Sequence, residues 1–296
     1  MRACLPFSNS LTVNAMGERW VGNGGAHRGY VAILLIAILG MAASTWFVAS
    51  LSVNTVRLER ERKNTAALAL AKQALIGRAA IDNSLPGSLP CPDLVTHIAG
   101  SNMPDDGIAD LFAGTNCPNY VGRLPWRTLG LPDLRDADGE RLWYALSPGF
   151  RDYASLVHIN DATVGTLSVA GANPVANIAA IVFSPGAALG SQLRNGGANQ
   201  NNAAHYLDGA NASGGPEFVA HAGDANFNDR LATITVADLM VVVEKRVALE
   251  LTKALNNYYL VNAVLPTPAL RNDVTCLPGG DAALCLPSGV NAPGLL

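Results

Sequence analysis

Charged and aromatic residues are both scarce in this sequence, and their scarcity restricts the classes of function it can serve. Charged residues make up 15% and aromatic residues 6% of the 296 residues, and the formal net charge is −3. Domains that bind nucleic acid are typically basic, and those that hold single strands stack bases on aromatic side chains. The composition therefore argues against a nucleic-acid partner, while its 49% of hydrophobic residues is typical of a globular chain.

The sequence also lacks a C-x-x-C pair, which argues against a zinc ribbon or a thioredoxin-type site. Cys4 precedes a long apolar segment, and Cys91, Cys117, Cys276 and Cys285 follow it. An even number of cysteines on the far side of such a segment favours an oxidising compartment. Four cysteines allow three pairings, of which we expect Cys91–Cys117 and Cys276–Cys285, because each pair lies in its own Pro/Gly-rich region.

No arrangement typical of an enzyme is visible in the sequence. Ser184, in "VFSPG", follows an expected strand but does not form a G-x-S-x-G nucleophile elbow. The histidines that follow the apolar segment are scattered. We therefore expect a protein that is not an enzyme.

Two oxygen-rich loops are candidate calcium sites. The first contains Asp105, Asp106 and Asp110, and the second contains Asp224, Asn226 and Asn228. Calcium takes six to eight oxygen ligands, which such loops can supply. Neither loop has the EF-hand spacing or its terminal Glu, and the alternative is that these residues build turns.

A cluster of aromatic and arginine residues has two possible interpretations, a ligand-binding surface or packing in the protein core. Its members are Trp126, Trp143, Tyr144, Arg123, Arg127 and Arg141. A surface for carbohydrate or peptide could use such residues. We expect instead that the aromatic rings pack in the core and that the arginines stack on their faces.

Residues 30–51 form an uncharged apolar run. As an α-helix this run would extend about 33 Å, against a hydrocarbon core of about 30 Å in a bilayer. The apolar region of a cleaved secretory signal is only about 7–15 residues long, so we expect a membrane-spanning helix instead. Arg19 and Arg28 precede the run, which favours a cytoplasmic N-terminus.

The helix is expected to continue beyond the apolar run. No proline occurs between Tyr30 and Leu85, and residues 64–81 are rich in strong helix formers. One helix of about 50 residues is therefore predicted, and its second half carries an apolar stripe suited to lie on a globular head. The stripe consists of Leu68, Ala71, Leu75 and Ala79.

A short leader that ends in Arg28 and Gly29, followed by Tyr30, an apolar helix and an amphipathic extension, resembles a type IV prepilin or a type II secretion pseudopilin. The resemblance implies cleavage by the prepilin peptidase between Gly29 and Tyr30, and methylation of the new N-terminus. The family usually has Glu as the fifth mature residue, where this chain has Leu34. In this respect it is similar to minor pilins and to tip-forming pseudopilins. A start at Met16 would give a leader of more usual length than residues 1–29.

The part after the helix is expected to form an α+β head with an antiparallel sheet. Three prolines in residues 85–93 end the first helix. Short apolar runs bounded by turn residues predict strands at 141–147, 164–171 and 177–186, with a turn at 136–139 and loops over 187–230. A second helix is predicted at 237–260, where Thr235 and Asp238 have the spacing of a capping box.

These features divide the chain into five expected parts. They are a cytoplasmic leader (1–29), a transmembrane or assembly half-helix (30–56), its amphipathic continuation (57–84), a loop-rich β head (85–236) and a second helix with a disulfide-closed loop (237–296). The resemblance implies a minor pilin or pseudopilin subunit in the bacterial inner membrane with a periplasmic head. Its expected partners are other pilin subunits and the prepilin peptidase, and the alternative is an unprocessed, membrane-anchored periplasmic binding or adhesion domain.

Overall fold

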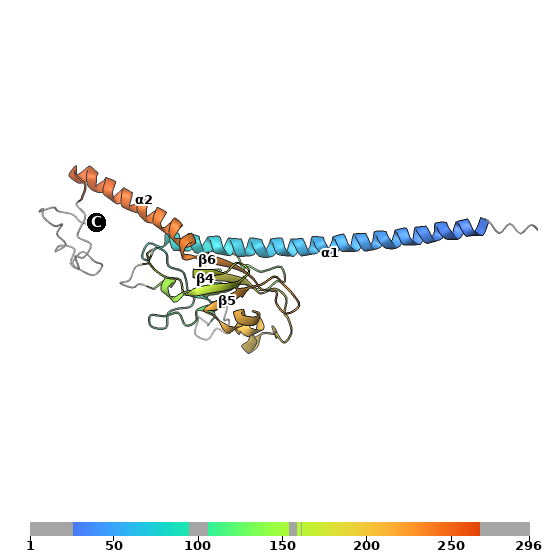
Figure 1. Ribbon diagram of the computed structural model, residues 1–296. Coiled ribbons are helices and arrows are strands. Elements are labelled where there is room, and N and C mark those ends of the chain that lie inside the picture. The colour runs from blue at the N-terminus through green and yellow to red at the C-terminus, as the bar shows by residue number, and fades with distance from the viewer. Residues whose placement is uncertain (1–25, 95–105, 154–158, 161, 267–296) are drawn as a thin grey trace, which may run out of the picture. The chain divides into compact units, whose positions relative to one another are not determined.

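The protein has an α+β fold, seen in a computed structural model that describes residues 26–94, 106–153, 159–160 and 162–266. Two long helices and one sheet dominate it (Figure 1). The elements are α1 (Ala26–Ile81), β1 (Val121–Arg123), β2 (Trp143–Leu146), β3 (Leu167–Gly171), β4 (Val175–Ser184), β5 (Glu217–Ala220), β6 (Arg230–Thr235) and α2 (Val236–Asn262), with short 3-10 turns at Pro148–Phe150, Gly197–Asn199, Ala203–His205 and Gly209–Ser213.

Helix α1 is continuous over 56 residues, which confirms the single long helix expected from the sequence. It ends where the side chain of Asp82 accepts hydrogen bonds from the backbone N–H groups of Ser84 and Leu85. These bonds stabilise a turn in place of a further helical turn. The chain contains two compact units, Met1–Arg57 and Leu58–Leu296, so α1 contributes to both.

The sheet of the second unit is mixed, not purely antiparallel as expected. Its strand order is β1-β2-β4-β3-β5, and β6 pairs with β4. Every pairing is antiparallel except that of β3 with β5, which is parallel, with Val169 opposite Phe218. A parallel pair requires a crossover between distant segments, which no local hairpin pattern in the sequence reveals.

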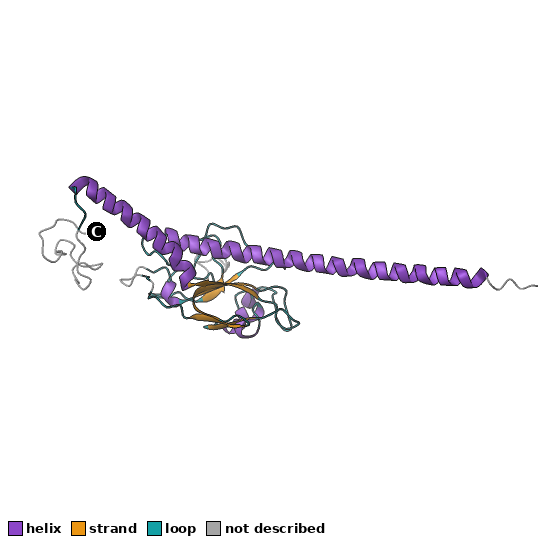
Figure 2. Ribbon diagram, turned by 45° about the horizontal axis from the view of Figure 1, so that its top comes forward, coloured by secondary structure: helices purple, strands orange, loops and turns teal. Residues whose placement is uncertain are grey.

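Both faces of the sheet are covered. In β2, Tyr144 and Leu146 face the core that contains the stripe of α1, whereas Trp143 and Ala145 face a second core formed with Phe218 and neighbouring residues. This alternation follows from the two-residue period of a strand. Figure 2 shows the helices along one side of the sheet, and the apolar stripe of α1 predicted from the sequence is buried there: Leu68, Ala71, Leu75 and Ala79.

The long segment 187–230, expected to be loops, contains more structure than its composition indicated. Strand β5 and three 3-10 turns lie within it, and β6 begins at its end. β5 is only four residues long, and it pairs with β3, which lies far away in the sequence. A strand this short has no periodicity that could be detected without its partner.

Helix α2 begins with the expected capping box. Thr235 accepts a hydrogen bond from the N–H of Asp238, and the Asp238 carboxylate accepts one from the N–H of Thr235. The apolar face starts buried, at Met240 and Val243, but it is half-exposed by Val247. The far part of α2 extends past the sheet in both views (Figures 1 and 2).

Candidate functional site

The first candidate surface is the apolar part of α1 within Met1–Arg57. Its side chains are exposed on every side of the helix, because apolar residues occupy the consecutive positions 33–36 and so cover a full turn. A helix that is apolar all round is normally surrounded by other apolar groups. The exposed large side chains here are Tyr30, Val31, Ile33, Leu34, Leu35, Ile36, Ile38, Leu39, Met41 and Trp46.

The processing residues expected from the sequence lie in this part of α1. Gly29 and Tyr30 are both helical, and Tyr30 is exposed. In the part of the chain that the structure describes, no helix combines the length and the apolar character needed to cross a membrane. The membrane crossing expected at residues 30–51 is therefore not confirmed, and the side chains of residues 47–51 lie outside the described set.

Cys91 and Cys117 form a disulfide in the head, which confirms the expected local pairing for these two cysteines. Both are buried in the core beneath α1. The bridge joins two positions with a sequence separation of 26 in the segment that links α1 to β1. Cys276 and Cys285 lie outside the described residues.

In the acidic loops considered for calcium, the described side chains take part in hydrogen bonds to the protein. Asp106 accepts a hydrogen bond from the N–H of Ile108, and Asp110 accepts one from the N–H of Leu94. Asp105 lies outside the described residues. The Asp106 bond is the short-range contact that Asp makes in turns, whereas the Asp110 bond joins two segments 16 residues apart.

In the second loop one contact is local to the turn and one is long-range. Asp224 accepts a hydrogen bond from the N–H of Asn226, and the Asn228 side chain donates to the carbonyl of Ala187. Among the described residues, no group of three or more His, Cys, Asp or Glu side chains is placed to hold a metal ion.

The second candidate surface is a cavity lined by arginines, and it begins at the turn expected over residues 136–139. Asp136 is fully buried and organises this turn. One carboxylate oxygen accepts hydrogen bonds from the N–H groups of Asp138 and Glu140, and the other accepts from the N–H of Gly186 and the hydroxyl of Ser184. The turn is thereby attached to the end of β4.

Two arginines flank this turn. Arg135 and Arg141 are opposite each other in an isolated antiparallel bridge, so their side chains leave the backbone on the same side. Asp133 holds both: its two oxygens accept from Arg141 Nε at 2.9 Å and from Arg135 Nη2 at 2.7 Å. Burial alone would raise the pKa of Asp133, but these hydrogen bonds outweigh it and lower the pKa below its ordinary value.

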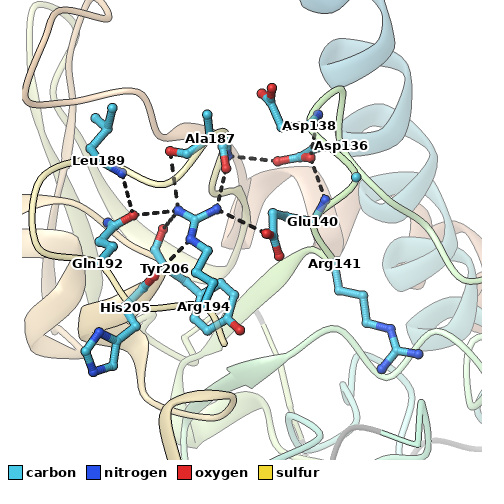
Figure 3. A network of polar contacts seen from close by, with 12 residues as sticks. Asp136, Asp138, Glu140, Arg141, Ala187, Leu189, Gln192, Arg194, His205 and Tyr206 are labelled. Carbon is cyan, nitrogen blue, oxygen red and sulfur yellow. Dashed lines mark hydrogen bonds and ion pairs between the residues drawn. The ribbon is translucent and has the colours of Figure 1, made fainter. Parts of the chain in front are cut away.

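A third arginine enters the cavity from the segment after β4. Arg194 donates to the carbonyls of His205 and Tyr206 and to the side chain of Gln192 (Figure 3). Its Nη1 lies 3.5 Å from a Glu140 carboxylate oxygen. Arg194 therefore connects the 187–207 segment to the turn that Asp136 organises.

The fourth arginine, Arg123 on β1, is buried against two aromatic rings. Its guanidinium carbon lies 4.4 Å from the ring centre of Trp143 and 4.0 Å from that of Tyr206. Trp143 and Tyr144 are fully buried, and Arg127 stacks on Trp126 at 5.0 Å. The expectation of a core ring with an arginine on its face is confirmed for Trp143 and Arg123, whereas Trp126 is only half-buried and outside both cores.

Together these residues line a cavity of about 330 Å³ in the head that is open to solvent. Its lining is Arg123, Arg135, Glu140, Arg141, Arg194, Gly196, Gln200 and Tyr206. Arg123 and Arg141 belong to the cluster for which a carbohydrate or peptide surface was considered from the sequence, but the other lining residues were not expected there. The expected turn at 136–139 could have indicated that Arg135 and Arg141 lie close together. Arg194 is distant from them in the sequence, and only the folded structure brings it to this cavity.

Comparison with known proteins found no match: no family model, no curated protein and no solved structure is similar to this chain.

Proposed function

We propose that this chain is a minor, pilin-like structural subunit of a type IV pilus or a type II secretion pseudopilus. The observation that carries the proposal is the exposed apolar part of α1, which continues as one helix into a stripe buried on the head. Burying one large apolar side chain contributes about 1.5–3 kcal/mol. Packing residues 30–46 against the helices of other subunits would therefore keep this stabilisation when the subunit leaves the bilayer for the filament, while the head remains outside the helical bundle.

In this proposal the precursor is held at the bacterial inner membrane with its head in the periplasm. The prepilin peptidase then cuts between Gly29 and Tyr30, and the new N-terminus is methylated. The Cys91–Cys117 disulfide supports an oxidising compartment for the head.

Leu34 supports a minor role at the filament tip. A charged group in hydrocarbon costs about 2.5–3.5 kcal/mol on insertion scales, so an amine there needs a carboxylate partner. Leu34 offers no carboxylate to the N-terminal amine of a neighbouring subunit, which disfavours repetition along a shaft. Quantitative mass spectrometry of sheared filaments should find this chain far below the main subunit, and a chain that dominates the filament would exclude the tip role.

Processing is the direct test of the proposed family. We expect Gly29→Glu to block cleavage, because the residue before the cut must be small, and immunoblots should then show the longer precursor accumulating. Gly25→Glu places the same charge in the leader away from the cut and should be processed normally. A mature wild-type chain that begins with methylated Tyr30 supports the proposal.

A mature chain that retains its leader would contradict the proposal and favour the second candidate, an unprocessed membrane-anchored binding domain. The arginine-lined cavity is the observation that favours this alternative, since it is a concave polar site in the head. The two candidates are thus separated by the identity of the mature N-terminus.

A further inference from the structure

We infer that a second cavity of the head, bordered by Trp143 and Asn201, binds a neutral saccharide through the hydroxyl groups of the ligand. This inference does not depend on the proposed function, because every residue that carries it lies in the unit Leu58–Leu296. It rests on two buried polar atoms without partners among the described residues, on the neutral lining of the cavity, and on its size.

The two atoms are a hydrogen-bond donor and a hydrogen-bond acceptor on residues that line the same cavity. Trp143 is only 1% exposed, and its Nε1 is buried with no acceptor among the residues that the structure describes. Asn201 donates through Nδ2 to the carbonyl of Leu94 at 3.1 Å, but its Oδ1 is buried with no donor in that same part of the chain. A buried polar group without a hydrogen bond destabilises the fold, so two of them at one cavity call for a common explanation.

Other polar residues of the lining use their side chains within the protein. The Asn202 side chain accepts a hydrogen bond from the N–H of Ala204, and the Ser213 hydroxyl donates to the carbonyl of Ala210. These residues shape the cavity, whereas the indole N–H and the amide oxygen described above are left for a ligand.

A hydroxyl group is suited to both of these atoms. It carries one donor and two acceptor lone pairs, so hydroxyls of one ligand can accept from the indole N–H and donate to the amide oxygen. None of the described residues that line the cavity is charged. An ion would lose hydration there without gaining a partner of opposite charge, so the lining favours a neutral ligand.

A peptide also carries donors and acceptors, but the sheet edge at this cavity disfavours it. Extended peptides typically bind by adding a strand to an exposed edge, and Val121 of β1 lies in the lining. The outer side of β1 is already bonded to another segment. Asp93 donates to the carbonyl of Arg123 at 2.9 Å, and the N–H of Arg123 donates to the carbonyl of Asp93 at 2.8 Å. A saccharide needs no free edge.

The size of the cavity is also appropriate. Its volume of about 480 Å³ lies within the range of small-molecule sites and is far above the ~30 Å³ that one water molecule occupies in the liquid. Apolar side chains such as Leu94 and Val121 complete the lining and can pack against the C–H groups of a sugar ring. Because the indole nitrogen is buried, a lining side chain must rotate to admit the hydroxyl, and such rotations are common on binding.

The indole N–H signals of the purified full chain, labelled with 15N-tryptophan, test the inference directly. The chain has four tryptophans, and loss of one signal in Trp143→Phe assigns that of Trp143. The probes are glucose, N-acetylglucosamine and the neutral peptide analogue N-acetylalanine methylamide. We expect at least one sugar to shift the Trp143 signal saturably and the peptide analogue to leave it unchanged. A saturable shift with the peptide analogue would overturn the saccharide assignment, and no shift with any probe would overturn the site itself.

Three variants, titrated calorimetrically with the sugar that binds, separate this site from general effects. Trp143→Phe keeps a ring but removes the N–H, so it should weaken binding about tenfold, equivalent to about 1.4 kcal/mol. Trp126→Phe is the matched control, because Trp126 Nε1 is also buried without a partner in the described ranges but its residue is not in the lining; the affinity should stay unchanged.

Asn201→Ala removes the acceptor from the other side of the site and should weaken binding to a similar extent. It keeps the inference testable if Trp143→Phe does not fold, and the melting temperature of each variant shows whether it does. Wild-type affinity in a folded Trp143→Phe or Asn201→Ala chain would overturn the inference.

Discussion

Asp229 is an acidic residue that the fold places in an unfavourable environment. Its side chain is buried close to Asp208, whose backbone N–H donates to it at 2.8 Å. The Asn211 side chain donates to the same oxygen at 2.9 Å, and the other carboxylate oxygen is buried with no hydrogen-bond partner among the residues that the structure describes. Burial raises the pKa of Asp229 to about 7, although both hydrogen bonds favour the ionised form.

This raised pKa predicts how stability depends on pH. The folded state holds a proton on Asp229 up to about pH 7, whereas the unfolded chain loses it near the ordinary value of 3.8. The free energy of unfolding should therefore fall as pH rises between these values and level off above the upper one. From about pH 5 to pH 8 the loss from this group is about 2–3 kcal/mol.

Asp229→Asn should remove this loss of stability. The free energy of unfolding of the variant minus that of the wild type should therefore be larger at pH 8 than at pH 5. Denaturant unfolding followed by circular dichroism at the two pH values measures the difference. Asp224→Asn, which removes an exposed carboxylate from the same segment, is the matched control. Parallel loss of stability in the wild type and in Asp229→Asn would show that Asp229 does not titrate in this range.

Helix α2 illustrates at the scale of an element how one sequence pattern can have two structural outcomes. Its apolar positions follow a single helical stripe from Met240 to Tyr258. Val243 is only 3% exposed, whereas Val247, one turn further along the same face, is 47% exposed. The stripe meets the core only at its start.

We expect Val243→Ala to destabilise the head by about 1–3 kcal/mol, because it removes buried methyl groups and leaves a cavity. The same change at Val247 should have almost no effect, because little packing is lost and Ala has the higher helix propensity. Thermal unfolding of the two variants side by side checks the contrast. Equal destabilisation would mean that the outer part of α2 is covered by groups beyond the described residues.

At the scale of the whole molecule, the two compact units make a prediction about folding. The unit Leu58–Leu296 contains both hydrophobic cores and the Cys91–Cys117 disulfide. We expect a chain that starts at Leu58 to fold and to unfold cooperatively on heating, with the disulfide formed.

A chain that starts at Asp82 is the control for this truncation. It lacks the stripe of α1 and so exposes the core side chains that contact Leu75 and its neighbours. We expect it to give no cooperative transition. If both chains unfolded with the same midpoint, the second half of α1 would not be part of the core.

The sequence alone determined the helices, because their signals are local. The continuity of α1 follows from an absence of proline and an excess of helix formers, and the start of α2 follows from Thr235 and Asp238. The turn at 136–139 and the pairing of Cys91 with Cys117 also depend on residues near one another in the chain. The sequence also led us to expect a membrane crossing at residues 30–51, and this is not confirmed among the described residues.

Only the tertiary structure decided the parallel pairing of β3 with β5, the point where the stripe of α2 leaves the core, and the arginine-lined cavity. Each of these depends on contacts between segments far apart in the chain, which the local pattern of either segment does not reveal. The placement of Arg194 beside Glu140 requires the 187–207 segment to fold against the turn that Asp136 organises. The number of charged residues is known from the sequence, but long-range packing determines whether residues of like charge lie in the same cavity.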